Sequence, residues 1–110
     1  MTATPPAVLV FAGYDPTGGA GVLADVEAIR ALGATPYAVI TALTAQGPRG
    51  VSRLAPVTPA LIDAQLEAAG PVRFRAIKIG MVGDARNARA LARLVSRGAF
   101  EQLAQTYSRR

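Results

Sequence analysis

The stretch from Val8 to Asp25 constrains the fold of this chain more than any other. Its first part, Val8 to Phe11, is a continuous apolar run of β-type residues, as expected for a strand that is covered on both faces. The residues that then interrupt regular structure are Pro16, Gly18, Gly19 and Gly21. An apolar pattern of helical period begins at Val22. The order strand, glycine-rich turn, helix predicts an open α/β sheet, in which the crevice above the strand ends binds the ligand.

The glycine-rich turn matches neither common phosphate-binding motif. Gly13 and Gly18 have the spacing of a P-loop, but Gly19 and Ala20 stand where that motif requires lysine and then serine or threonine. The dinucleotide pattern G-x-G-x-x-G is also absent. Two interpretations of the turn therefore stay open: a ligand-binding loop, or a tight turn that only allows the helix and the strand to pack closely.

Asp25 is a candidate ligand-binding residue on the helix that follows. The apolar face of this helix consists of Val22, Val26, Ile29 and Leu32. We expect Asp25 to lie within the same arc, on the inward side of the first turn, whereas Glu27 points away. An inward carboxylate costs free energy unless it is hydrogen-bonded or paired. Either Asp25 contacts a ligand, or it is an N-terminal acid that the helix dipole or the N–H groups of the loop stabilise.

The composition is that of one folded domain without cysteine or histidine chemistry. The chain has 110 residues, of which 51% are hydrophobic and 17% are charged. Without cysteine there is no disulfide framework, thiol nucleophile or cysteine-based metal site, and without histidine the usual zinc ligand and general base are missing. No apolar run is long enough to span a bilayer, and the N-terminal residues lack the regions of a signal peptide, so we expect a cytoplasmic protein.

Positive charge is concentrated in the C-terminal part of the chain. The net charge is +5 at pH 7, and residues 69–110 hold nine basic residues against two acids. At helical spacing, one face carries Arg86, Arg89, Arg93 and Arg97, and the opposite face carries Ala88, Leu91, Ala92 and Val95. No aromatic residues interleave with this arginine stripe and no nucleic-acid-binding motif is present, so we expect a solvated helix face and no nucleic-acid partner.

The rest of the chain alternates between strand-like and helix-like segments. The first helix is expected to run to Leu32, with Gly33 as its C-cap. Beyond it, the pattern predicts a strand at 37–43, a loop at 44–50, an edge strand at 51–57, a helix at 59–69 capped by Thr58, a core strand at 76–79 and a helix capped by Asp84 that Gly98 ends. The inner stripe of the second helix is expected to be Leu61, Ile62, Gln65 and Leu66. This order implies a mostly parallel sheet with right-handed crossovers.

Three of the predicted loops, at 13–21, 44–50 and 80–83, leave the C-terminal ends of strands and should therefore converge on one site. Gln46 offers an amide that suits the edge of a heterocycle, since it both donates and accepts hydrogen bonds. Met81 offers a polarizable thioether that suits the face of a flat ring. The alternatives are an ordinary loop hydrogen bond for Gln46 and a place in the core for Met81.

Motifs in these segments resemble, in the same order, those of the bacterial hydroxymethylpyrimidine/phosphomethylpyrimidine kinases of thiamine biosynthesis. The motifs are Ala12-Gly13-Tyr14-Asp15-Pro16-Thr17-Gly18-Gly19-Ala20-Gly21, Ala24-Asp25, Ala31-Leu32-Gly33-Ala34, Val39-Ile40-Thr41-Ala42-Leu43-Thr44-Ala45-Gln46, Arg49-Gly50-Val51 and Lys78-Ile79-Gly80-Met81. The resemblance covers about residues 7–95. It implies an α/β protein with the three-layer α/β/α fold of the ribokinase-like superfamily.

The resemblance also implies an activity and a site. The family transfers the γ-phosphoryl group of ATP, with Mg²⁺, to 4-amino-5-hydroxymethyl-2-methylpyrimidine and then to its monophosphate. The residues that it implies for the pyrimidine pocket are Gly13, Asp25, Gln46 and Met81. The expected partner is this small molecule, with no nucleic acid and no membrane, and either a homo-oligomer or a second, complementing chain is possible. A vitamin-B6-type kinase stays open, because the superfamily shares the placement of the pocket.

The chain departs from the family in its length and its last residues. Family members are over twice as long, and their later half carries most of the ATP site and a Gly-Thr-Gly-type anion-hole loop with the catalytic Cys or Asp. No catalytic residue can therefore be assigned here. We expect a single truncated domain over residues 1–110, with a divergent helical tail at 96–110. Either the chain is part of a kinase, or it is a non-catalytic remnant that keeps only part of the pyrimidine pocket.

Overall fold

The computed structural model describes residues 4–96 and contains strands and helices in the predicted order. These elements are β1 (Ala7–Tyr14), α1 (Gly21–Ala31), β2 (Thr35–Gly47), β3 (Gly50–Pro56), α2 (Pro59–Ala68), β4 (Phe74–Ile79) and α3 (Ala85–Ser96). The expected end of the last helix at Gly98 lies outside the described residues. So does the expected tail at 96–110, except for Ser96.

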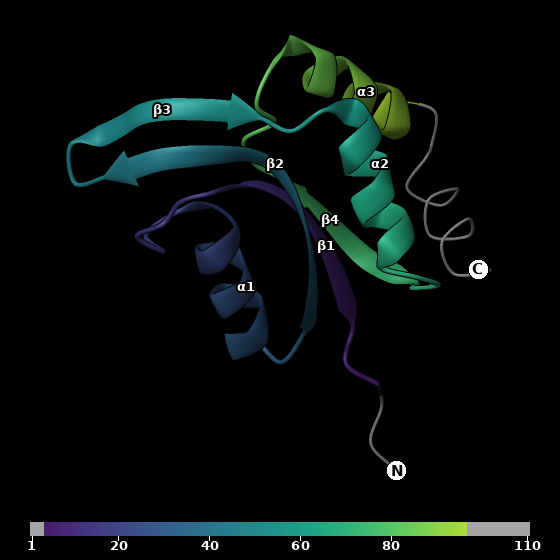
Figure 1. Cartoon of the computed structure of the whole chain (residues 1–110). Coiled ribbons are helices and arrows are strands. Elements are labelled where there is room, and N and C mark those ends of the chain that lie inside the picture. The colour runs from purple at the N-terminus through teal and green to yellow at the C-terminus, as the bar shows by residue number, and fades with distance from the viewer. Residues whose placement is uncertain (1–3, 97–110) are drawn as a thin grey trace.

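The sheet has the strand order β3-β2-β1-β4 (Figure 1). The central strand β1 pairs in parallel with β2 on one side and with β4 on the other, and β3 runs antiparallel to β2. The prediction of a mostly parallel sheet is thus confirmed. Because the three parallel strands end at the same edge, the segments that follow β1 and β4 meet beside the far half of β2.

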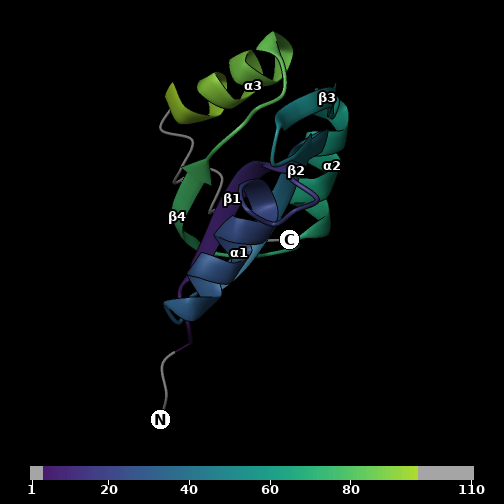
Figure 2. The ribbon, with the colours of Figure 1, turned by 90° about the vertical axis from the view of Figure 1, so that its left-hand side faces the viewer.

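The side chains of β1 alternate between two hydrophobic clusters on opposite faces of the sheet. Leu9 and Phe11 pack in a cluster that also contains residues of α2 and α3, whereas Val10 and Ala12 pack with Val22 of α1. Figure 2 accordingly shows α1 in front of the sheet and α2 behind it. Burial of all four β1 residues explains the continuous apolar run in this strand, and the three-layer α/β/α prediction is confirmed.

The prediction of a loop at 44–50 is wrong. Strand β2 continues to Gly47 and forms a hairpin with β3, in which Thr44 pairs with Leu54 and Gly47 with Gly50. Only residues 48 and 49 lie in the turn. The antiparallel ladder satisfies the backbone groups of this segment, which outweighs the loop propensity of its glycines and proline. Every residue of β3 is exposed, and Figure 1 shows the hairpin extending away from the rest of the sheet.

The second helix begins as predicted, but its inner face is narrower. Thr58 caps α2 by accepting a hydrogen bond from the backbone N–H of Leu61 at 3.2 Å, and Ile62 and Leu66 are buried. Leu61 itself is 53% exposed, so its assignment to the inner stripe is wrong. Gln65 does point inward: its amide accepts from the N–H of Ile40 at 2.9 Å and donates to the C=O of Ile40 at 2.8 Å.

The last two elements also differ from the prediction in their burial. Strand β4 forms an edge of the four-stranded sheet, with Phe74 as its only buried residue, so it is not the core strand that the sequence predicts. On α3, the inner face is centred on Asn87 and Leu91 rather than on the predicted alanines, because Ala88 and Ala92 are exposed. The three described arginines of the predicted stripe are exposed, as expected: Arg86, Arg89 and Arg93.

Candidate functional site

Asp15 organises the glycine-rich turn between β1 and α1. It is almost fully buried, and its carboxylate accepts hydrogen bonds from the backbone N–H groups of Thr17 at 2.9 Å and Ala20 at 3.1 Å. The Thr17 hydroxyl donates to the same carboxylate at 2.9 and 3.0 Å. The acid that bonds the N–H groups of the loop is therefore Asp15 and not Asp25. This Asx-type turn fixes the direction in which the chain enters α1.

Gly21 allows α1 to begin directly against the end of β1. Its φ angle is +65°, and a Cβ atom there would lie 2.3 Å from the carbonyl oxygen of Gly13. No L-residue fits without moving one of these backbones. The residue at the N-cap is Ala20, which offers no side chain to cap the helix. Close packing of helix and strand is thus real, and it brings the first turn of α1 to the strand ends.

Asp25 is held by an ion pair with Lys78, the only lysine in the chain. Lys78 lies on β4 opposite Val10, whose side chain faces α1, so its ammonium group reaches the α1 side of the sheet. The Asp25 side chain is 12% exposed and that of Lys78 is 56% exposed. Asp25 lies in the second turn of α1, and the first turn contains no acidic residue, so the predicted place in the first turn is wrong.

A cavity of about 240 Å³ lies at the C-terminal ends of the parallel strands. All four residues of the predicted pocket line it, namely Gly13, Asp25, Gln46 and Met81. The other lining residues are Ala12, Asp15, Ala20, Gly21, Thr44, Lys78 and Gly80. Lys78 was missed as a site residue because it lies within a strand and meets Asp25 only through the sheet pairing. The sequence signal that could have identified Lys78 is its position just before Gly80 and Met81.

Gln46 and Met81 reach the cavity from different elements. Gln46 lies in the extended part of β2, and its Oε1 is 3.4 Å from the hydroxyl of Thr44, which also donates to the carbonyl of Tyr14 at 2.6 Å. Met81 follows β4, is 40% exposed, and has its Sδ 3.1 Å from where a Cβ of residue 13 would stand. Glycine at position 13 therefore leaves room for the thioether at the mouth of the cavity.

The loop that carries Met81 leads directly into α3. Asp84 caps this helix, since its Oδ1 accepts from the N–H of Asn87 at 3.0 Å, and its Oδ2 pairs with Arg86 at 3.1 Å. The hydrogen bond from the Asn87 backbone, followed by the Arg86 interactions, lowers the pKa of Asp84 below its usual value, although partial desolvation opposes this. The predicted cap is confirmed, and it anchors the far end of the loop.

The arrangement provides a small cavity whose lining includes carboxylate, amide, ammonium and thioether groups. Such a set can hold a flat ring that carries both donors and acceptors. Among residues 4–96 we find no group of three or more His, Cys, Asp or Glu placed to hold a metal ion. None of the helices in this range has the length and hydropathy needed to cross a bilayer.

Comparisons of the sequence and of the structure with known proteins point to the same family of kinases. The family model of phosphomethylpyrimidine kinase matches residues 15–104. A hydroxymethylpyrimidine/phosphomethylpyrimidine kinase of Escherichia coli K12 is 42% identical over 90 residues, which are 81% of this chain and 34% of that protein. The phosphomethylpyrimidine kinase structure from Clostridium difficile 630 superposes with a TM-score of 0.74 at 33% identity, over 86% of this chain and 41% of that one.

A second kind of kinase shares the fold. The pyridoxal kinase of Staphylococcus aureus in complex with AMP-PCP and pyridoxal also has a TM-score of 0.74, at 26% identity, over 86% of this chain and 36% of that one. The chain thus spans between 34% and 41% of the length of these three kinases. The family model, in contrast, covers most of this chain. The chain belongs to the phosphomethylpyrimidine kinase family.

Proposed function

We propose that this chain forms the pyrimidine-binding part of a kinase that phosphorylates 4-amino-5-hydroxymethyl-2-methylpyrimidine and its monophosphate in thiamine biosynthesis. The observation that carries the proposal is the single cavity lined by Gly13, Asp25, Gln46 and Met81. Its volume of about 240 Å³ is below the range of about 300–1,000 Å³ that is common for drug-sized ligands. A substrate with one ring suits this space.

Each of the four residues has a distinct role in this proposal. Asp25 accepts a hydrogen bond from the ring substituents, and Gln46 presents its amide to the ring edge. Met81 packs on the ring face, and Gly13 leaves the space that the thioether and the ring need. Lys78 fixes the Asp25 carboxylate and adds the only cationic group among the residues that line the cavity.

ATP is the proposed phosphoryl donor and Mg²⁺ its metal. The support is the family and the Staphylococcus aureus pyridoxal kinase, which binds AMP-PCP, an analogue of ATP. The described residues do not fit a nucleotide–metal site by themselves: the glycine-rich turn lacks the P-loop lysine, and residues 4–96 hold no cluster of metal ligands. Phosphoryl transfer relies on positioning and electrostatic stabilisation of the transferred group, and we assign neither to this chain.

Two alternatives have specific support. The match to pyridoxal kinase at the same TM-score favours a vitamin-B6-type substrate, but the identities of 42% and 33% to the pyrimidine kinases exceed the 26% to that enzyme. The lack of a nucleotide–metal site among residues 4–96 favours a non-catalytic chain, or one that works with a second copy or a complementing chain. We place the protein in the cytoplasm, in keeping with the metabolite that it is proposed to bind.

Calorimetric titration of the chain with hydroxymethylpyrimidine and, separately, with pyridoxal tests the proposal. We expect weak binding of the pyrimidine that Gln46→Ala reduces and that Asp63→Ala, at an exposed residue of α2 outside the cavity, leaves unchanged. Preferential binding of pyridoxal would favour the B6-type alternative, and no binding of either compound would refute the proposed site. Incubation with ATP, Mg²⁺ and the pyrimidine should give no turnover. Full-length Escherichia coli kinase is the positive control, and turnover by the purified chain alone would contradict the assignment of a binding part only.

A further inference from the structure

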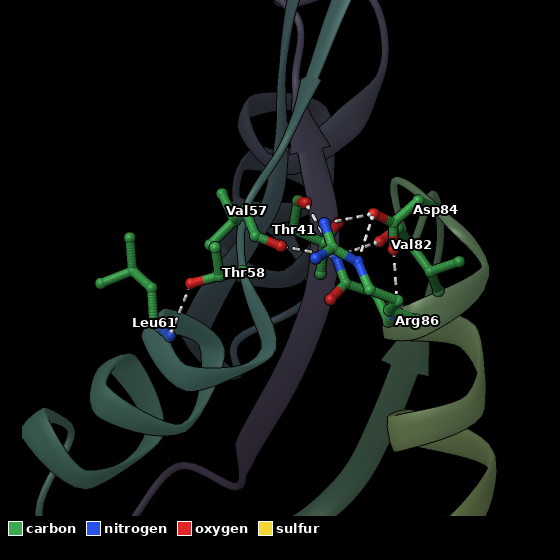
Figure 3. A network of polar contacts seen from close by, with 8 residues as sticks. Thr41, Val57, Thr58, Leu61, Val82, Asp84 and Arg86 are labelled. Carbon is green, nitrogen blue, oxygen red and sulfur yellow. Dashed lines mark hydrogen bonds and ion pairs between the residues drawn. The ribbon is translucent and has the colours of Figure 1, made fainter.

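A buried amide on α3 joins three segments that are distant in the sequence. The side chain of Asn87 is fully buried, and its Nδ2 donates to the carbonyl oxygens of Val57 at 2.7 Å and Val82 at 2.9 Å. It also reaches the carbonyl oxygen of Thr41 at 3.5 Å. Figure 3 shows Thr41, Val57 and Val82 converging beside the start of α3. One amide group therefore ties β2, the segment after β3 and the loop after β4 together.

The backbone of Met81 is part of the same network. The fully buried hydroxyl of Thr41 donates to the carbonyl oxygen of Met81, and the carbonyl of Thr41 accepts from the N–H of Val57 at 2.8 Å. Gly83, with a φ angle of +95°, passes so close that a Cβ there would lie 2.8 Å from the Thr41 carbonyl and 3.3 Å from Asn87 Nδ2. Since the N–H of Gly80 also donates to the carbonyl oxygen of Phe11 at 2.7 Å, the loop at 80–83 is fixed on both sides of Met81.

Asn87 is an unusual choice for a residue that only fills space. Its Oδ1 is buried without a hydrogen-bond partner among the described residues, which is unfavourable for stability. The amide cannot be turned to relieve this, because its three neighbours are all carbonyl oxygens and accept only. The three carbonyls therefore fix the orientation of the amide, with its Nδ2 as their shared donor.

We infer that Asn87 is a positioning residue that fixes Met81 over Gly13 at the mouth of the cavity. Asn87 is not among the residues that line the cavity and acts through the carbonyls of Thr41 and Val82. The consequence for ligand affinity rests on the proposed function, whereas the positioning of Met81 does not. Without the amide, the loop at 80–83 keeps the bond from the Thr41 hydroxyl, but the carbonyls of Thr41 and Val82 lose the donor that joins them, and the thioether no longer has one defined place.

The ε-methyl group of Met81 reports this positioning directly. The chain has two methionines, Met1 and Met81, so methyl-¹³C-methionine labelling gives two resonances, and Met81→Leu assigns them. In Asn87→Leu, which keeps the approximate volume but has no donor, we expect the Met81 resonance to move toward its position in the unfolded chain. Asn87→Ala, which leaves room for water at the carbonyls, is a second variant in case the first does not fold.

Leu66→Ala is the matched control. It removes buried volume from α2, which contributes no hydrogen bond to the Asn87 amide, and so it destabilises the chain by another route. Under conditions where all variants are folded by circular dichroism, Leu66→Ala should leave the Met81 resonance in place. An unmoved resonance in the folded Asn87 variants, or an equal shift in Leu66→Ala, would overturn the inference. Failure of both Asn87 variants to fold would also overturn it, because the role would then be structural.

Affinity gives the second measurement. Asn87→Leu should weaken the binding of hydroxymethylpyrimidine about tenfold, the loss that corresponds to one misplaced contact, and Leu66→Ala should not. If the wild-type chain does not bind the pyrimidine, the proposed function is wrong, yet the Met81 resonance still decides the positioning role. If the wild type binds and the folded Asn87 variants bind equally well, the link between Asn87 and the site is refuted.

Discussion

The ammonium group of Lys78 on β4 forms an ion pair with the carboxylate of Asp25 on α1, across the central strand β1. The two residues are 53 positions apart in the sequence. The pair lies in the wall of the cavity and leaves the second carboxylate oxygen of Asp25 outside this ion pair. It therefore orients Asp25 for a further hydrogen bond.

Asp25→Ala should weaken the binding of hydroxymethylpyrimidine by about 1.5–3 kcal/mol, the range for a hydrogen bond to a charged group. Isothermal titration calorimetry at fixed salt concentration measures the change. Glu27→Ala is the control, because Glu27 is exposed on the same helix, and this variant should bind like the wild type. Unchanged affinity in Asp25→Ala would mean that a different group receives the ligand.

Gly21→Ala should destabilise the chain strongly. The positive φ angle alone costs about 1–2 kcal/mol for an L-residue, and the new Cβ would lie 2.3 Å from the Gly13 carbonyl oxygen, so the strand or the helix must also move. Gly33→Ala is the matched control: its φ angle is also positive, at +83°, but no atom lies within 4 Å of the added Cβ. Urea denaturation should show the larger loss for Gly21→Ala. Equal losses would show that the close approach of α1 to β1 adds nothing.

Asp84 should make the free energy of unfolding depend on pH in the acidic range. Its hydrogen bond from the Asn87 N–H and its pair with Arg86 lower its folded-state pKa below 3.8. A carboxyl with a lowered pKa contributes stability above its unfolded-state pKa, and this contribution disappears as the pH falls through the folded-state value. Asp84→Asn keeps an N-cap but has no charge. We expect the variant to be less stable than the wild type near neutral pH and equally stable in strong acid. A constant difference between the two denaturation midpoints across this range would contradict this.

The exposed hairpin should make the isolated chain self-associate. Val51 and Leu54 on β3 are 48% and 40% exposed, and β3 forms an edge of the sheet. Exposed apolar edge strands pair readily with other chains. Light scattering across a concentration series should therefore show association that Leu54→Lys reduces. Leu61→Lys, at a residue that is 53% exposed on α2, is the control and should associate like the wild type. A monodisperse monomer at all concentrations would refute the prediction.

Local signals predicted much of the fold. Three helix starts could be predicted, near Gly21, at Thr58 and at Asp84. The glycine turn or the capping residue that defines each start is close to it in the sequence. The apolar run at 8–11 likewise predicted a strand that is covered on both faces, as β1 is. The hairpin was missed because its two strands are stabilised by pairing with each other. The low strand propensity of Gly47 and Gly50 gives no sign of this pairing.

The candidate site was predicted from family-like motifs and strand-end topology, and the structure brings its four residues to one cavity. Their roles in binding stay predictions. What the sequence could not provide were the partners of these residues. The ion pair of Asp25 with Lys78 depends on the pairing of β1 with β4, and the hold of Asn87 on the Met81 loop depends on how α3 docks. Both are tertiary contacts that helical or strand periodicity does not encode.

Gln65 has a consequence for how the sheet is bounded. Strand β3 pairs with β2 only from Ala42 onward, so the outer edge of β2 before that point has no neighbouring strand among the described residues. The amide of Gln65 bonds both the N–H and the C=O of Ile40, as a residue of such a strand would. The side chain thus acts as a one-residue substitute strand. It also sets the register of α2 on the sheet, because a shift of the helix by one turn would break both bonds.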